Sequence, residues 1–123
     1  MEAKLGEVKI NGITYVPKES VKQMAQSLDG LPIVMVRTYS AGVFYGSLAE
    51  RNGKEVKLYN ARRVWYWDGA ASLSQLAEKG TSKPQNCKFP VAVSEIILTE
   101  AIEIISMTED AIKSLNSVKV WEQ

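Results

Sequence analysis

The sequence has no histidine and only one cysteine, Cys87, and both shortages limit the catalytic and metal-binding sites that the chain could form. Histidine is the commonest general base and the commonest metal ligand, and a lone thiol can build neither an internal disulfide nor a zinc site. The chain also lacks a run of 18 apolar residues, and its opening, MEAKLGEVKI, lacks the apolar stretch of a signal peptide. We therefore expect a cytosolic protein without a membrane span, metal or cofactor.

The bulk composition is that of one ordinary globular domain. The chain has 123 residues, of which 46% are hydrophobic and 24% charged, enough to form a core without covalent cross-links. Its 15 basic and 14 acidic residues give a net charge of +1, whereas non-specific binding to DNA or RNA requires a strong basic excess. We expect a single domain over residues 1–123 that does not bind nucleic acid.

The first half of the chain contains two hairpin signals. Asn11-Gly12 lies between short β-prone stretches within residues 7–16, and Asn52-Gly53 separates residues 43–49 from residues 55–66. Such Asn-Gly pairs accept the positive φ of a two-residue hairpin turn. Between the two hairpins, Ser20 with Gln23 predicts a capped helix that Gly30 can close, and residues 32–38 predict a strand. The segment 1–30 is a candidate for dimerisation.

The second half alternates between helix and strand signals. Ser72 with Gln75 predicts a short helix ending at Gly80, and Thr108 predicts the start of a last helix. Residues 91–107 fit a strand by their β-branched content and a helix by the spacing of their isoleucines, and we favour the strand. The predicted fold class is α+β, an antiparallel β-sheet built from hairpins with two or three short helices packed on it.

Alternation along residues 55–66 separates two neighbouring arginines. One predicted face carries Val56, Leu58, Asn60, Arg62, Val64 and Tyr66, and the other carries Lys57, Tyr59, Ala61, Arg63, Trp65 and Trp67. A guanidinium binds phosphate in a bidentate manner and stacks on rings. A single pocket would use one of the two arginines, and the other would form a structural pair or reach a subunit interface.

Two segments could bind an anion through backbone N–H groups. The turn after Arg37 consists of Tyr39, Ser40, Ala41 and Gly42, whose small side chains leave the backbone open to a ligand. The helix that begins near Ser72 offers unpaired N–H donors and the hydroxyl of Ser74. The turn could equally be a tight connection, and the helix start, taken alone, is better explained as a capped helix that binds nothing.

Aromatic side chains beside these segments could bind a base. Trp65, Tyr66 and Trp67 are consecutive, and stacking on a base contributes on the order of 1–3 kcal/mol, although such rings are more often core or interface. The amide of Asn60 could read an adenine edge or cap a turn. Catalysis has little support, because Cys87 beside Lys88 and the pair Asp68 and Glu78 are more simply structural or solvated residues.

The segments "VRTYSAGVFYGSL", "VKLYNARRVWYWDGAASLSQLAEKG", "KFP" and "SEIILTEAIEIISMTEDAIKSL" together carry a resemblance. From about Val36 onward the chain resembles a family of small phage proteins, the Thoeris anti-defence sponges. The resemblance implies a non-catalytic protein of the host bacterial cytoplasm that binds a cyclic ADP-ribose isomer made by TIR-domain enzymes. It further implies pockets at a homodimer interface, an antiparallel sheet with helices packed on it and, in some members, higher assembly and separate sites for cyclic oligonucleotides.

Carried onto this sequence, the resemblance and the residue chemistry predict one set of ligand-binding side chains. The phosphate and ribose contacts are Arg37, Ser40, Gly42, Arg62, Ser72 and Ser74; the stacking candidates are Tyr39, Phe44, Trp65 and Trp67; the polar readers are Asn60 and Asn86. The alternative is a phage structural or assembly protein that uses the aromatic strand to associate with itself.

Overall fold

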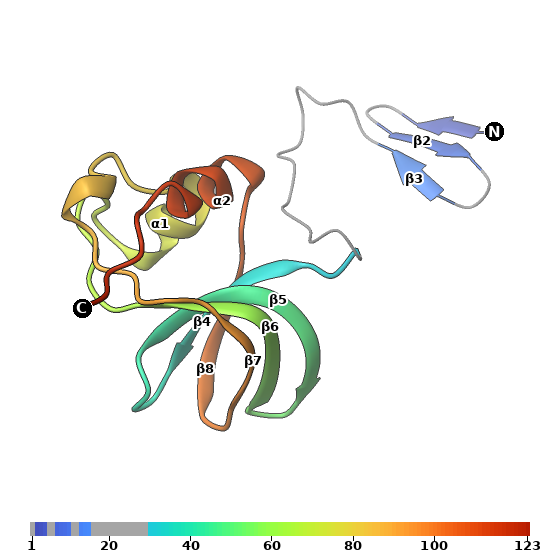
Figure 1. Ribbon diagram of the computed structural model, residues 1–123. Coiled ribbons are helices and arrows are strands. Elements are labelled where there is room, and N and C mark those ends of the chain that lie inside the picture. Colours follow the sequence, from blue (N-terminus) through green and yellow to red (C-terminus); the bar gives the residue numbers. More distant parts are fainter. Residues whose placement is uncertain (1, 5–6, 11–12, 16–29) are drawn as a thin grey trace.

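The computed structural model describes residues 2–4, 7–10, 13–15 and 30–123 (Figure 1). The N-terminal part forms a three-stranded antiparallel sheet of β1 (Glu2–Lys4), β2 (Glu7–Ile10) and β3 (Ile13–Tyr15), in that order. Ile10 pairs with Ile13, which confirms the hairpin predicted there. The turn residues Asn11-Gly12 and the helix predicted from Ser20 lie outside the described residues.

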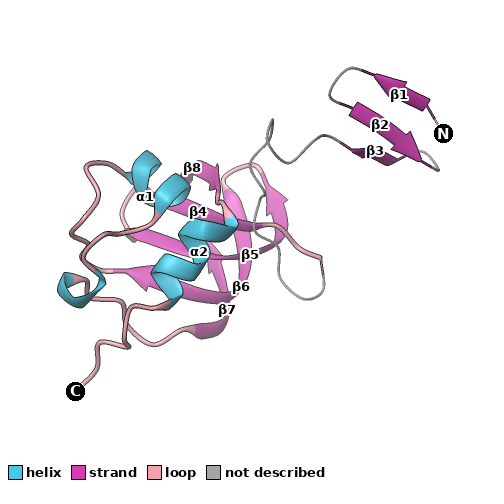
Figure 2. Cartoon of the chain, turned by 90° about the horizontal axis from the view of Figure 1, so that it is seen from above, coloured by secondary structure: helices cyan, strands magenta, loops and turns pink. Residues whose placement is uncertain are grey.

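The main sheet has five antiparallel strands, which confirms the predicted α+β class. In chain order they are β4 (Ile33–Thr38), β5 (Val43–Asn52), β6 (Glu55–Val64), β7 (Val93–Leu98) and β8 (Ala101–Ser106). Their order in the sheet is β7-β6-β5-β4-β8. Helices α1 (Leu73–Lys79) and α2 (Glu109–Asn116) both lie over one face of this sheet (Figure 2).

The two edge strands of this sheet are joined by only two residues. Thr99 and Glu100 connect β7 to β8, although these strands occupy opposite edges, so the sheet must curl until its edges approach each other (Figure 1). The amide of Ala101 donates to the carbonyl of Lys54 at 3.0 Å, which ties this link to the β5–β6 turn. Residues 91–107 therefore form strands, as favoured from the sequence, but two of them rather than one.

The curled sheet separates two hydrophobic clusters. The first lies between the sheet and the helices, and the second lies on the opposite face, inside the curl. The helix-side cluster contains Met35, Tyr45, Val64, Leu76, Ala77, Phe89, Met107, Ala111, Leu115 and Val118. The inner cluster contains Val34, Val36, Phe44, Val56, Leu58, Ala61, Leu98 and Ala101.

A β-bulge at Asn60 changes which residues of β6 share a face. Asn60 has a φ of 52°, and the pairing with β5 shifts by one residue at this point, opposite Gly46. Before the bulge Leu58 faces the inner cluster, and after it Ala61 does. The predicted strict alternation over residues 55–66 is therefore wrong, because it assumed an unbroken period of two. The strand also ends at Val64, two residues earlier than predicted.

The β5–β6 turn is one residue later than predicted. Asn52 pairs with Glu55, so the two turn residues are Gly53 and Lys54 rather than Asn52 and Gly53. Gly53 has a φ of 62°, the left-handed conformation that such turns require.

Both helices begin at the predicted caps. The hydroxyl of Ser72 accepts from the amide of Gln75 at 3.1 Å, and that of Thr108 accepts from the amide of Ala111 at 3.1 Å. Helix α1 ends at Gly80, whose φ of 75° and ψ of −153° are accessible almost only to glycine. These caps satisfy backbone groups that the ends of the helices would otherwise leave unpaired.

Candidate functional site

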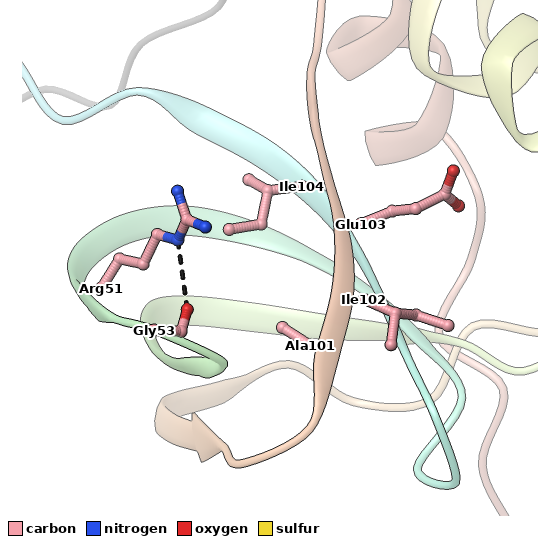
Figure 3. Close-up of a pocket in the computed structure, with 6 residues that line it drawn as sticks. All are labelled: Arg51, Gly53, Ala101, Ile102, Glu103 and Ile104. Carbon is pink, nitrogen blue, oxygen red and sulfur yellow. Dashed lines mark hydrogen bonds between the residues drawn. The ribbon is translucent and has the colours of Figure 1, made fainter.

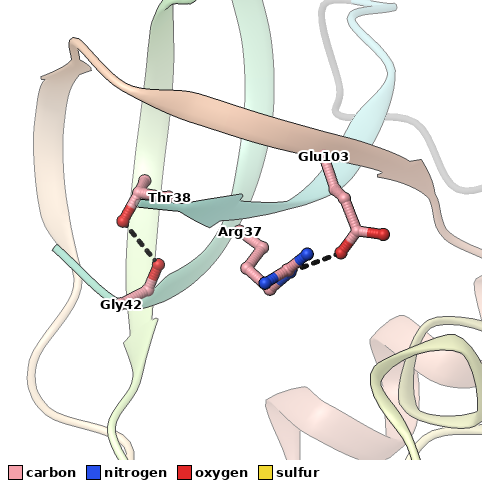
Figure 4. A network of polar contacts seen from close by, with 4 residues as sticks. All are labelled: Arg37, Thr38, Gly42 and Glu103. Atoms are coloured by element: carbon pink, nitrogen blue, oxygen red, sulfur yellow. Dashed lines mark hydrogen bonds and ion pairs between the residues drawn. The ribbon is translucent and has the colours of Figure 1, made fainter. Parts of the chain in front are cut away.

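The turn between β4 and β5 is held by one threonine. The Thr38 hydroxyl donates to the carbonyl of Gly42 at 2.8 Å and accepts from the amide of Ala41 at 2.8 Å (Figure 4). Gly42 has a φ of 96°, which a larger residue would adopt only with strain. The turn is therefore fixed from within, while the small residues Ser40 and Ala41 are exposed at its tip.

Arg63 leans over this turn from β6. Its guanidinium carbon lies 4.3 Å from the centroid of the Phe44 ring, and its Nη1 group donates to the carbonyl of Ala41. Within residues 30–123, Arg63 makes no other hydrogen bond and no ion pair. The guanidinium is thus fixed in place by a ring and a carbonyl, while its Nε and Nη2 donors remain available to a ligand.

A surface hollow of about 460 Å³ opens beside Arg63. Its walls are formed by Ser40, Ala41, Gly42, Val43, Arg63, Val64 and Trp65. The Trp65 side chain is 61% exposed, so a ligand in the hollow could reach the ring. The hollow therefore combines a cation, an aromatic ring and a turn with an open backbone, and we call it the Arg63 hollow.

The Arg63 hollow brings together only some of the predicted residues. Ser40, Gly42 and Trp65 line it, and Phe44 is buried beneath Arg63 as part of the inner cluster. Tyr39 is exposed at the neighbouring position of the turn.

Two of the side chains predicted to contact an anion interact with carboxylates of the protein itself. The hydroxyl of Ser40 donates to Oε1 of Glu100 at 2.9 Å. Nε of Arg37 lies 2.5 Å from Oε1 of Glu103, its partner across the β4–β8 pair (Figure 4). Arg37 and Ser40 therefore each have a carboxylate partner, whereas the guanidinium of Arg63 has none.

Arg62 is turned the other way, into the helix-side cluster, where it is only 8% exposed. Nη2 donates to the carbonyls of Val118 at 2.7 Å and Phe89 at 3.4 Å, and Nη1 to the carbonyl of Leu115 at 3.3 Å. The remaining donors bond to the Pro90 carbonyl and the Tyr45 hydroxyl.

All five N–H donors of Arg62 are therefore occupied within the protein, which leaves none for a phosphate. The assignment of Arg62 as a phosphate ligand is corrected for that reason. The two arginines do face opposite sides of the sheet, as predicted, and Arg63 is the one that the sequence analysis left out. The available signal was its spacing from Trp65, because residues two apart on a strand share a face.

The remaining predicted residues lie outside the Arg63 hollow. Ser72 and Ser74 are exposed at the start of α1, Trp67 packs against the helix-side cluster, and Asn60 forms the bulge. Nδ2 of Asn86 donates to Oδ2 of Asp68 at 2.9 Å. This bond, with a second from the amide of Gly69, lowers the pKa of Asp68 below its usual value. Of these residues, Trp67, Ser72, Ser74 and Asn86 lie in or next to the loops at the start of α1 and before β7, whereas Asn60 lies within β6.

Two other hollows contain none of the predicted residues. One of about 180 Å³ lies between β8 and the β5–β6 turn, where Arg51 donates to the carbonyl of Gly53 at 3.2 Å (Figure 3). The other, of about 430 Å³, is lined by Pro84, Gln85, Cys87, Ser117 and Lys119. Neither contains an arginine with free donors next to an aromatic ring, the combination found at the Arg63 hollow.

Two further observations concern the part of the chain that the structure describes. No three residues among its cysteine, aspartate and glutamate side chains are grouped so that they could hold a metal ion. None of its helices has the length and apolar character needed to cross a membrane.

The fold and the hollow define an α+β domain with a curled five-stranded sheet and a small polar site at the β4–β5 turn. A family model described as a domain of unknown function (DUF6948) matches residues 31–115, and the chain belongs to that family. The match runs from just before β4 into α2 and stops before the C-terminal residues. Comparison with curated proteins and with solved structures finds no match.

Proposed function

We propose that this protein binds a cyclic ADP-ribose isomer in the Arg63 hollow and sequesters it without cleaving it. In a phage-infected bacterium this would remove the messenger made by TIR-domain enzymes and block Thoeris defence. The sequence resemblance supplies the ligand class. The observation that carries the proposal is Arg63, which is fixed over Phe44 with free donors beside an exposed tryptophan.

Each part of such a ligand has a partner in the hollow. The diphosphate accepts from Nε and Nη2 of Arg63, an edge of the guanidinium suited to two parallel hydrogen bonds. The adenine stacks on Trp65. The ribose hydroxyls donate to the carboxylate of Glu100, which lies outside the walls of the hollow and accepts from the wall residue Ser40 at 2.9 Å. A carboxylate bonded to a wall residue of the hollow favours a ligand that carries hydroxyl donors as well as phosphate.

The openness of the hollow favours a dimer. Sequestration of a messenger present at about micromolar concentration requires nanomolar affinity, or about −12 kcal/mol. A ligand of about 35 heavy atoms at about −0.3 kcal/mol each approaches this value only when it is well enclosed. We propose that a second subunit closes the hollow, which light scattering with and without ligand would test; a monomer in both conditions would contradict it.

Calorimetric titration with cyclic ADP-ribose isomers tests the function. We expect nanomolar binding by the natural protein, a loss of about tenfold or more in Arg63→Ala, and no change in Arg51→Ala, an exposed arginine away from the hollow. After heat denaturation, mass analysis of the supernatant should recover the ligand intact. Recovery of a cleaved product would make the protein an enzyme, and no heat with any isomer would reject the ligand class.

Self-association through the aromatic surface is the second candidate function. Trp65, Tyr66 and Trp121 are 61%, 51% and 43% exposed, so these rings leave a large aromatic surface open to solvent even though Trp65 and Trp121 stack on each other. If this surface serves assembly, sedimentation velocity should show association that depends on protein concentration and is lost in Trp65→Ala. In that case ligand would have no effect on the association.

A further inference from the structure

The Trp65 ring has a stacking partner from the far end of the chain. The centroids of Trp65 and Trp121 are 6.0 Å apart, and their ring planes are inclined by only 17°. Nζ of Lys88 lies 5.6 Å from the centroid of Trp121. Trp121 is nevertheless 43% exposed, so this contact is made at the surface rather than in a core.

Backbone contacts fix the C-terminal residues next to Trp65. The amide of Trp121 donates to the carbonyl of Phe89 at 2.9 Å, and Val120 forms a parallel bridge with Phe89. On the other side of this segment, the amide of Trp65 donates to the carbonyl of Lys88 at 3.2 Å. Residues 88–89 thus join β6 to the C-terminal residues, which places the two tryptophans together by main-chain geometry.

We infer that Trp121 is a positioning residue of the ligand site, which makes the C-terminal residues beyond the matched domain part of that site. Trp121 covers one face of Trp65. The other face remains for the base, at the hollow that Trp65 lines together with Arg63. This inference rests on the proposed function, since it assigns Trp121 to orienting Trp65 in the same hollow for an aromatic ligand.

The physical reason is pre-organisation. An exposed tryptophan at the end of a strand can change rotamer, and a ligand that stacks on it must restrict that freedom on binding. A ring already held by a parallel neighbour loses less entropy. Trp121 therefore improves the binding of ligands with a planar base and contributes nothing to ligands that have only phosphate and sugar.

The test compares two probes, cyclic ADP-ribose and the base-free ribose 5-phosphate, titrated into the full-length protein. Trp121→Ala should weaken binding of cyclic ADP-ribose about fivefold or more and leave ribose 5-phosphate unchanged. Trp121→Phe, which keeps a ring, should recover most of the affinity. Val120→Ala is the matched control, because it changes an exposed neighbour and keeps both rings.

The stacking itself has a spectroscopic signature that does not need a ligand. The Trp65 and Trp121 rings are close enough, at 6.0 Å between centroids, for exciton coupling, so we expect a couplet in the circular dichroism of the natural protein that is absent in Trp121→Ala. If the natural protein binds cyclic ADP-ribose and Trp121→Ala binds it equally well, this inference is overturned while the proposed function stands. If the natural protein binds neither probe, both are overturned, whatever the couplet shows.

Discussion

Arg62 and Arg63 are adjacent in the chain, yet they occupy opposite kinds of environment. Arg62 lies on the helix-covered side of the sheet, where four main-chain carbonyls and a tyrosine hydroxyl use all its donors. Arg63 lies on the other side, over Phe44, with one bond to Ala41. The first arrangement holds the structure together, and the second leaves a cation available for a ligand.

The carbonyl ligands of Arg62 explain how a charge is buried there without a carboxylate. Leu115 belongs to the last turn of α2 and Val118 follows the helix, so the guanidinium lies at the negative end of the helix dipole. Hydrogen bonds from a charged donor to these carbonyls satisfy groups that a helix end leaves free. Residue chemistry alone therefore does not distinguish a structural arginine from one with free donors; the partners of its donors do.

The largest expected effect is on stability and comes from the buried arginine. Arg62→Met keeps an apolar chain of similar length but removes five hydrogen bonds from a charged donor and leaves the Val118 carbonyl without its donor, which should cost about 3 kcal/mol or more in unfolding free energy. Arg63→Met removes one bond at the surface and should cost less than about 1 kcal/mol. Urea denaturation measures both, and equal losses would break the distinction between the two arginines.

A smaller loss is expected where the helices meet. A Cβ at Gly80 would lie 2.3 Å from Cβ of Ser114, and its backbone conformation suits only glycine, so Gly80→Ala should cost about 2 kcal/mol or more. Gly53→Ala is the matched control, because Gly53 also has a positive φ but a Cβ there meets no atom within 4 Å. It should cost about 1 kcal/mol. Equal thermal shifts in the two variants would contradict close packing of α1 against α2.

The pH dependence of stability should also report on the helix-covered side. Burial raises the pKa of Tyr45 above its usual 10.0, and the hydrogen bond and charge of Arg62 act in the opposite direction. Because the unfolded chain then loses this proton first, the contribution is present below about pH 10 and is lost as the pH rises further. Denaturation at increasing pH should show a shallower decline in Tyr45→Phe, and identical slopes would reject the effect.

The smallest effect is expected from a third arginine, at the surface. The Arg37–Glu103 ion pair has both side chains about half exposed, so its coupling energy should be below about 1 kcal/mol and should fall with added salt. A double-mutant cycle with alanine at both positions measures this coupling. A value above about 2 kcal/mol would mean that exposed arginines also hold this sheet together.

The features that could be predicted from the sequence are those that depend on local chemistry. The caps at Ser72 and Thr108 and the glycine end of α1 each depend on residues within one turn, and the structure confirms them. The bulge at Asn60 depends on Gly46 in another strand, where a Cβ would lie 2.9 Å from the carbonyl oxygen of Tyr59. A pattern read along one strand does not contain that contact.

The same distinction applies to the candidate site. The small-residue turn stands out in the sequence because its short side chains leave the backbone open, and Trp65 stands out because it lies in a run of three aromatic residues. Which of the two arginines has free donors depends on which face of the sheet the helices cover. The position of Trp121 next to Trp65 depends on a main-chain bridge between Phe89 and Val120, residues far apart in the chain. Both are long-range features, so the residue types in one segment do not determine them.

The most direct test of the central claim is a nuclear magnetic resonance titration of the isotope-labelled protein with cyclic ADP-ribose. The Arg63 hollow predicts that the shifted amides centre on residues 39–43 and 63–65, with the side-chain signals of Trp65 and Trp121 among them. Shifts centred instead on residues 68–75, around the start of α1, or no shifts at all, would contradict it.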